Sequence, residues 1–112
     1  MRREERLTKS SQFAAVFKNG KAWAHDLMVL RAMPNGLEFS RLGLVVSKRV
    51  GKKAVIRNRV RRLLREVARS TPIEPGWDIV IIARKEAAGV RYSEIQSAMI
   101  VLLGRARLRG RG

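Results

Sequence analysis

The side chains best suited to chemistry in this sequence are arginines, and they are concentrated between residues 47 and 69. This stretch holds ten of the chain's 25 lysines and arginines and a single acid, Glu66. Guanidinium groups bind phosphates through two parallel hydrogen bonds and stack on planar bases, so arginine-rich sequences suit polyanions. Because one acid cannot neutralise ten cations, most of them have no partner within the stretch. The stretch therefore predicts a surface that binds a polyanion.

Side chains that could catalyse a reaction are scarce and dispersed. The nine acids are scattered along the chain, so no spacing gathers carboxylates as a nuclease with two metal ions requires. The chain has no cysteine and a single histidine, His25, to which we assign no role. Disulfides, thiolate metal sites and a cysteine nucleophile are excluded, and no phosphate-binding glycine loop or Ser-His-Asp arrangement is recognisable. These residues predict a binding protein with no catalytic or metal site of its own.

The net charge narrows the choice of partner. A formal charge of +16 on 112 residues is typical of proteins that meet nucleic acid or an anionic membrane. The longest nearly uncharged stretches, 77–83 and 97–104, are far shorter than the roughly 20 residues that span a bilayer, and no signal peptide opens the chain. We therefore expect a cytoplasmic protein that binds no membrane. Its length suits one RNA-binding domain, residues 1–112, with frayed basic ends at about 1–6 and 108–112.

The arginines must be positioned by a helix, which is predicted from Ala54 or Ile56 to Arg69. At 100° per residue, an aliphatic stripe occupies one side of this helix and the arginines spread over the other. The stripe consists of Ile56, Val60, Leu63, Leu64 and Val67. Because the stripe is narrow and lacks Trp and Phe, it favours packing on a sheet over lying on a membrane. Only Glu66 could pair within the helix, with Arg62 one turn earlier.

A first helix is predicted over Gln12–Lys18, with Ser10 or Ser11 as its cap and Gly20 at its end. Three large apolar side chains share one face of it. They are Phe13, Val16 and Phe17. Residue type alone favours a core role for the two aromatic rings, and the alternative is a floor on which an unpaired base stacks.

The remaining elements form a sheet and its second cover. Strands at 27–33 and 38–47 are expected to form a hairpin through Pro34-Asn35-Gly36, with Trp23 packing at the sheet edge. The apolar run at 77–83 predicts a buried central strand, and a last helix follows at about 93–107. The order is α-β-β-α-β-α, a single-domain α/β sandwich of the α+β class. General topology rules make its βαβ crossover right-handed.

Three blocks of this sequence resemble the protein subunit of bacterial ribonuclease P. They are RLTKSSQFAAVFKNGK near the start, LGLVVSKRVGKKAVIRNRVRRLLREVAR in the middle and DIVIIARK near the end, in the same order. The resemblance covers about residues 6–103. It implies a protein that acts with a catalytic RNA subunit to remove the 5′ leader of precursor tRNA. The chemistry then belongs to the RNA with bound Mg²⁺, and the protein part is expected to be a monomer.

The resemblance also implies a fold and a site. The fold is that of the second domain of ribosomal protein S5, with a mixed sheet and an unusual left-handed crossover, which reverses the general expectation. The residues implied to bind the RNA subunit are Arg57, Asn58, Arg59, Arg61, Arg62 and Arg65. The residues implied to bind the leader are Phe13, Phe17, Lys48, Arg49, Lys52, Lys53, Arg84 and Lys85. Both phenylalanines thereby change from expected core to expected base-stacking floor.

Some assignments stay open at this point. The family's leader-binding cleft lies between the first helix and the sheet. Many members have an aromatic residue on the first strand where this chain has Arg31, and an arginine facing that cleft would replace stacking by charge. Asn58 could contact RNA, or it could cap the helix and orient the loop before it. Two other functions also remain: a ribosomal or other structural RNA-binding protein, and a self-sufficient nuclease, which the scattered acids disfavour.

Overall fold

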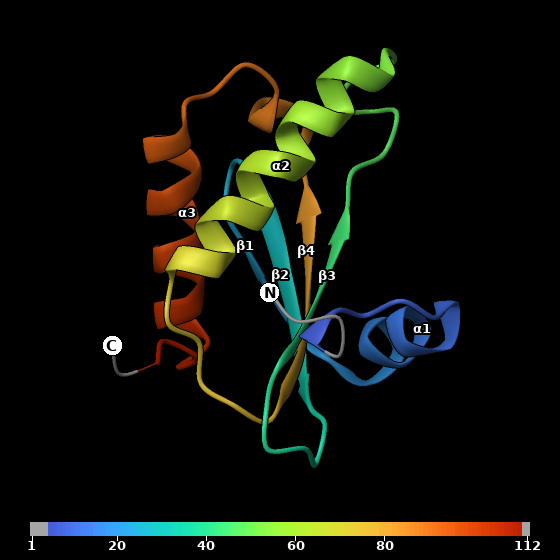
Figure 1. Ribbon diagram of the computed structural model, residues 1–112, viewed down its shortest axis with the longest axis vertical. Coiled ribbons are helices and arrows are strands. Elements are labelled where there is room, and N and C mark those ends of the chain that lie inside the picture. Colours follow the sequence, from blue (N-terminus) through green and yellow to red (C-terminus); the bar gives the residue numbers. More distant parts are fainter. Residues whose placement is uncertain (1–4, 111–112) are drawn as a thin grey trace.

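A four-stranded mixed sheet forms the centre of the computed structural model, which describes residues 5–110 (Figure 1). The strand order is β1-β2-β4-β3. The strands are β1 (Lys21–Ala24), β2 (Met28–Pro34), β3 (Arg41–Val45) and β4 (Trp77–Ala83). The helices are α1 (Ser10–Asn19), α2 (Ala54–Ser70) and α3 (Tyr92–Arg105), with a short 3-10 helix η2 (Lys85–Ala87). Helices α2 and α3 lie side by side over one face of the sheet, as Figure 1 shows.

Strand β4 is buried on both faces, as its continuous apolar run predicted. Ile79 and Ile81 belong to the main core under α2 and α3, and both are 1% exposed. Val80 points to the other face, where it packs with Val16 of α1 and with Leu7. Successive side chains of a strand point to opposite faces, so a strand covered on both sides needs apolar residues at every position.

The predicted hairpin between the strands at 27–33 and 38–47, which are β2 and β3 of the structure, is wrong. Strand β2 pairs with β4 in the antiparallel sense, β3 pairs with β4 in the parallel sense, and β4 therefore lies between them. The connection after β2 is bonded to β4 and to the residue before it: Asn35 donates from its side chain to Asp78 in β4 and from its backbone to the carbonyl of Gly76. These contacts tie the turn to β4 instead of letting the chain fold directly back on β2.

A strand that the sequence did not predict supplies the real hairpin. Strand β1 pairs antiparallel with β2, from Lys21 opposite Ala32 to Ala24 opposite Val29. It is mostly exposed, so it carries no clear apolar alternation. Trp23 of this strand packs against the main core, as expected. The predicted α-β-β-α-β-α order is otherwise confirmed, with β1 as one additional strand after α1.

The crossover from β3 through α2 to β4 is left-handed. In Figure 1 both strands point upward, α2 lies in front of them, and β4 lies to the left of β3. Parallel βαβ connections are right-handed in the great majority of proteins. The resemblance therefore predicted the hand correctly, and the general rule did not.

The predicted stripe of α2 is confirmed at its centre and wrong at its first residue. Val60, Leu64 and Val67 have no exposed surface, whereas Ile56 remains 37% exposed. Ile56 lies in the first turn, which projects past the ends of the strands (Figure 1). None of the helices between residues 5 and 110 combines the length and apolar character that a bilayer-spanning segment needs.

The start of α1 is capped by a glutamine instead of a serine. The side-chain oxygen of Gln12 accepts hydrogen bonds from the backbone N–H groups of Thr8 (2.8 Å) and Lys9 (3.0 Å). A side chain at the third position of a helix can reach back in this way to bond the backbone N–H groups of the N-cap residue and of the residue before it. Ser10 therefore lies inside the helix, while Gly20 ends it as predicted.

The described parts of both predicted frayed ends make backbone contacts with the fold. Arg6 forms a parallel bridge with Leu42, and the following N–H of Leu7 donates to the carbonyl of Leu42. At the other end Leu108 has no exposed surface, and its carbonyl accepts a hydrogen bond from Glu74. A single leucine among arginines thus anchors the basic segment. The outer parts of the predicted tails, residues 1–4 and 111–112, lie outside the described residues.

Arg107→Gly is expected to be more stable than Arg107→Ala by about 1 kcal/mol. Arg107 has a φ of 58°, in the left-handed region, where a Cβ atom is disfavoured and glycine is not. The two variants lose the same charge, so urea unfolding of the pair isolates the backbone effect. Equal free energies of unfolding would contradict this assignment.

Candidate nucleic-acid interface

The outer face of α2 is a row of exposed arginines. Helix α2 buries its aliphatic side on the sheet, which leaves the opposite side to solvent. The exposed arginines and amide on this helix are Asn58, Arg59, Arg62, Arg65 and Arg69, while Arg57 and Arg61 are half-buried. Within residues 5–110, no hydrogen bond or ion pair ties Arg62 or Arg65 to the protein, and the predicted pair with Glu66 does not form. These two guanidinium groups are therefore free to bind an external anion.

Two arginines of the predicted motif are already bound within the protein. Arg57 donates from Nη1 to the carbonyls of Gly51 (2.9 Å) and Lys52 (2.7 Å). Arg59 donates from Nη2 to the carbonyl of Val90 at 3.2 Å, in the loop before α3. Each guanidinium keeps further N–H groups, so an additional contact with phosphate is possible. Within the protein, Arg57 thus holds the loop before α2 and Arg59 holds the loop before α3.

Asn58 orients a neighbouring arginine and does not cap the helix. The helix starts at Ala54 after Lys53, so Asn58 lies in its second turn. Its side-chain oxygen accepts a hydrogen bond from Nη1 of Arg61 at 3.0 Å. Of the two roles left open by the sequence, capping is excluded.

Phe13 belongs to a groove beside the edge strand β3. Its ring lies directly on Gly43, where an added Cβ would stand 2.5 Å from the ring. The groove measures about 160 Å³, and its wall across from Phe13 carries Arg61 and Arg65 of α2. Phe13 is half-buried and packs on the small cluster around Val80, so the core interpretation holds for part of its surface. Sequence reasoning missed Gly43, whose absent side chain makes room for the ring.

Phe17 occupies different surroundings, although it is one helical turn from Phe13. It is 41% exposed, and its ring lies over the guanidinium of Arg31 in β2. An exposed aromatic ring on a basic protein is a common platform for an unpaired base. Phe17 therefore fits the predicted stacking role better than Phe13 does.

A basic cavity of about 600 Å³ lies where β3 and β4 end. The two strands are parallel, so the residues that follow them meet at the same edge of the sheet. The cavity brings together Arg49, Arg84 and Lys85, with Ile82 on its apolar wall. Ile82 packs with the cluster beneath α1, so the cavity is on the α1 side of the sheet.

The other predicted lysines surround this cavity without lining it. Lys48 is exposed in the turn after β3, and Lys52 and Lys53 are exposed in the loop that leads into α2. Arg57 of α2 holds the conformation of this loop by donating hydrogen bonds to two of its backbone carbonyls. These lysines thus extend the positive charge from the cavity toward the start of α2.

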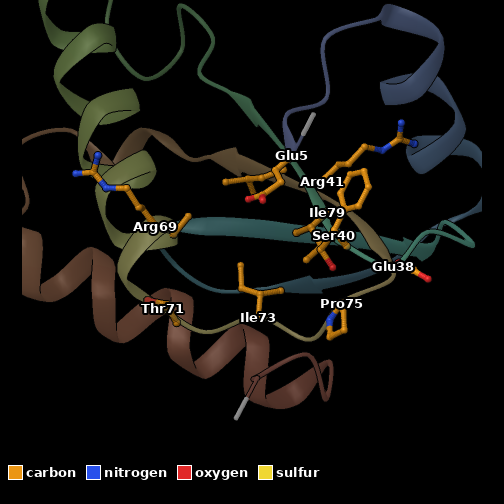
Figure 2. Close-up of a pocket in the computed structure, with 12 residues that line it drawn as sticks. Glu5, Glu38, Ser40, Arg41, Arg69, Thr71, Ile73, Pro75 and Ile79 are labelled. Atoms are coloured by element: carbon orange, nitrogen blue, oxygen red, sulfur yellow. The ribbon is translucent and has the colours of Figure 1, made fainter. Parts of the chain in front are cut away.

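Figure 2 shows a further cavity, of about 510 Å³, at the opposite end of the sheet. Glu5 and Glu38 lie on its rim, Arg69 and Thr71 stand at the end of α2, and Ile73 forms part of its wall. None of the residues predicted for RNA binding lines it. The mixed charges of this rim do not continue the basic surfaces.

Between residues 5 and 110, no three His, Asp or Glu side chains come together as metal ligands. Mg²⁺ prefers several oxygen donors around one octahedral position. The described part of the chain does not offer such a donor set.

Two cationic surfaces thus lie on opposite faces of one sheet, the arginines of α2 on one and the basic cavity on the other, and the groove around Phe13 joins them at the β3 edge. Such surfaces, combined with the exposed ring of Phe17, define an RNA-binding protein.

Comparisons with known proteins make this class specific. The family model described as Ribonuclease P matches residues 1–107. The ribonuclease P protein component of Dehalococcoides mccartyi strain 195 is 44% identical over 108 residues, which cover 96% of this chain and 89% of the relative. That of Roseiflexus castenholzii is 41% identical, with 95% and 88% covered. The chain belongs to the ribonuclease P protein family, whose members are the protein part of a tRNA-processing endoribonuclease.

Solved structures agree with this assignment. The ribonuclease P protein of Thermotoga maritima has a TM-score of 0.82 at 36% identity, with 90% of this chain and 96% of that chain covered. A Staphylococcus aureus ribonuclease P protein, a mutant described as having defective mRNA degradation activity, has a TM-score of 0.85 at 30% identity, with 94% and 90% covered. The fold is therefore that of the family over at least 90% of the chain.

Proposed function

We propose that this protein binds the catalytic RNA of ribonuclease P through the outer face of α2, and the 5′ leader of precursor tRNA through the α1 face of the sheet. The RNA with its Mg²⁺ carries out the hydrolysis, and the protein acts in the cytoplasm as a monomer. The observation that supports this division is the placement of the exposed α2 arginines and of the basic cavity on opposite faces of the sheet, which offers a surface to each of two RNA molecules.

The leader is assigned to the α1 face because of what gathers there. A single-stranded segment presents bases that can stack and a line of phosphates that needs cations. Phe17 supplies an exposed ring, and Arg49, Arg84 and Lys85 supply charge around an open cavity. The face of α2 offers arginines without an exposed aromatic ring, which suits the phosphates of a folded RNA.

Cleavage of precursor tRNA at low Mg²⁺ concentration tests the proposal. Three reactions are compared: the catalytic RNA alone, the protein alone, and both together. We expect the protein to stimulate the RNA and to cleave nothing by itself. The protein-alone reaction matters because one solved relative is described in terms of mRNA degradation.

Each alternative predicts a different pattern. Cleavage by the protein alone would overturn the proposal in favour of a self-sufficient nuclease. Binding to RNA without any stimulation of cleavage would favour a structural RNA-binding protein.

Phe17→Ala is expected to weaken binding of leader-bearing precursor tRNA to the holoenzyme by about 1–3 kcal/mol, the contribution of one stacked base. Binding of tRNA without a leader should be unchanged. Val101→Ala is a matched control, because Val101 is also 41% exposed but lies on α3. Equal weakening with and without the leader would restore a purely structural role for Phe17.

A further inference from the structure

Arg31 lies beneath the Phe17 ring and is bonded to the same residue. Its guanidinium carbon is 5.5 Å from the ring centroid, and its Nη2 donates to the backbone carbonyl of Phe17 at 2.7 Å. One side chain of β2 thus holds both the ring and the backbone of a residue in the last turns of α1. A cation at the carbonyl end of a helix is also favoured by the helix dipole.

The surroundings of Arg31 supply no competing anion. Its neighbours across the sheet are Ala22 in β1 and Val80 in β4, both uncharged. Its Nε is buried and has no hydrogen-bond partner within the described residues. The position of the guanidinium is therefore set chiefly by the ring and the carbonyl of Phe17.

We infer that Arg31 is a positioning residue for base stacking in the leader cleft. It fixes the Phe17 ring from one side, so that the exposed remainder of the ring is held ready for an unpaired base of single-stranded RNA. Fixing a binding group before the ligand arrives reduces the ordering that binding would otherwise require. The inference rests on the proposed function of the cleft, and it assigns to Arg31 an effect through Phe17 instead of a direct phosphate contact.

The geometry favours this indirect role over direct binding. A guanidinium that served mainly as a phosphate ligand would point its N–H edge outward. Here Nη2 is directed at the carbonyl of Phe17, and the guanidinium carbon lies over the Phe17 ring. Contact between a cation and a ring of this kind changes affinity by about threefold to tenfold when the ring itself binds the ligand.

A double-mutant cycle between Arg31 and Phe17 tests the inference. The variants Arg31→Met, Phe17→Ala and their combination are assembled with the catalytic RNA, and the affinity of each holoenzyme is measured for precursor tRNA with and without its leader. Arg31→Met should lower the leader-dependent gain in affinity about threefold to tenfold in the normal background, and should have no further effect once Phe17 is Ala. The salt dependence of leader binding should not change, because no phosphate contact is lost.

Arg31→Lys keeps the charge and guards against a folding defect in the Met variant. Lysine cannot offer a planar group to the ring, so we expect it to recover less of the leader-dependent gain than the original arginine. An Arg31→Met effect that persists in the Phe17→Ala background, or that is equal with and without the leader, would overturn the inference. If Phe17→Ala loses leader-dependent affinity and Arg31→Met loses none, the role of Arg31 is overturned and the proposed leader-binding surface stands. If Phe17→Ala loses no leader-dependent affinity, the proposed leader-binding surface is itself overturned.

Discussion

Arg62→Ala and Arg65→Ala are each expected to weaken binding of the catalytic RNA roughly tenfold, and to lower the slope of log affinity against log salt by roughly 0.7 to 0.9. Both side chains are exposed on α2 and have no bond to the protein within the described residues. Each can therefore transfer its whole guanidinium to a phosphate and release one counterion. The two effects should nearly add in the double variant if the contacts are independent.

Lys21→Ala provides the matched control for this experiment. Lys21 is exposed on β1, the sheet edge opposite β3, and its replacement lowers the net charge by the same amount. A slope change as large for Lys21 as for Arg62 would mean that the binding depends on total charge and not on the face of α2. An unchanged slope in the double variant would place the catalytic RNA elsewhere.

Arg57→Ala should behave differently from these variants. Its removal leaves the carbonyls of Gly51 and Lys52 without their donor, so part of the loss appears in the stability of the loop. The sequence does not distinguish the seven arginine and asparagine side chains on this helix from one another. Which of them already bond to the protein depends on where the neighbouring loops lie in the fold.

Elements with a strong local pattern were predictable. The run WDIVIIA reads as a strand covered on both faces, and β4 has the predicted bounds. Helix α2 carries a regular aliphatic stripe; it starts at Ala54, one of the two predicted residues, and ends one residue beyond the predicted Arg69. In both cases the sequence alone carries the periodicity that burial requires.

The partner of each strand was not predictable in the same way. The turn after β2 has the residues of a hairpin, yet the strand that pairs with β2 after this turn, β4, comes more than forty residues later. Asp78 of β4 is bonded to the turn, and such a bond exists only in the folded chain. Strand β1 escaped prediction for another reason, since an exposed edge strand needs little apolar pattern.

The residue types of the site were predictable from the sequence, but which of these residues contact one another was not. Phe13 and Phe17 share a helical face, but Gly43 admits one ring onto β3 while Arg31 holds the other. Likewise Leu108 carries no periodic signal, and its burial follows from the approach of the loop that contains Ile73. Contacts between distant segments decide these cases, and a single sequence does not contain them in readable form.

Asp78 accepts hydrogen bonds from Arg41 and Asn35, and with Arg41 it forms an ion pair. Asp78 is 5% exposed and accepts two hydrogen bonds from Arg41, at 2.8 Å and 2.6 Å, and one from Asn35 at 3.0 Å. The bond to Asp78 raises the pKa of Arg41, against the opposing effect of burial. The network joins the start of β3, the turn after β2 and the start of β4, which are the three segments that set the unexpected strand order.

Asp78→Ala is expected to lower the free energy of unfolding by about 3 kcal/mol, because it leaves a partly buried guanidinium and an amide without their acceptor. Removing any acid from a chain of charge +16 also increases repulsion, so urea unfolding of Glu38→Ala, an exposed acid in the preceding loop, measures that general effect. The difference between the two variants should survive in high salt, which screens surface repulsion but not a buried pair. If both variants lose the same stability, and salt restores both equally, the network does not fix the strand order and the arrangement of β2, β4 and β3 must rest on apolar packing alone.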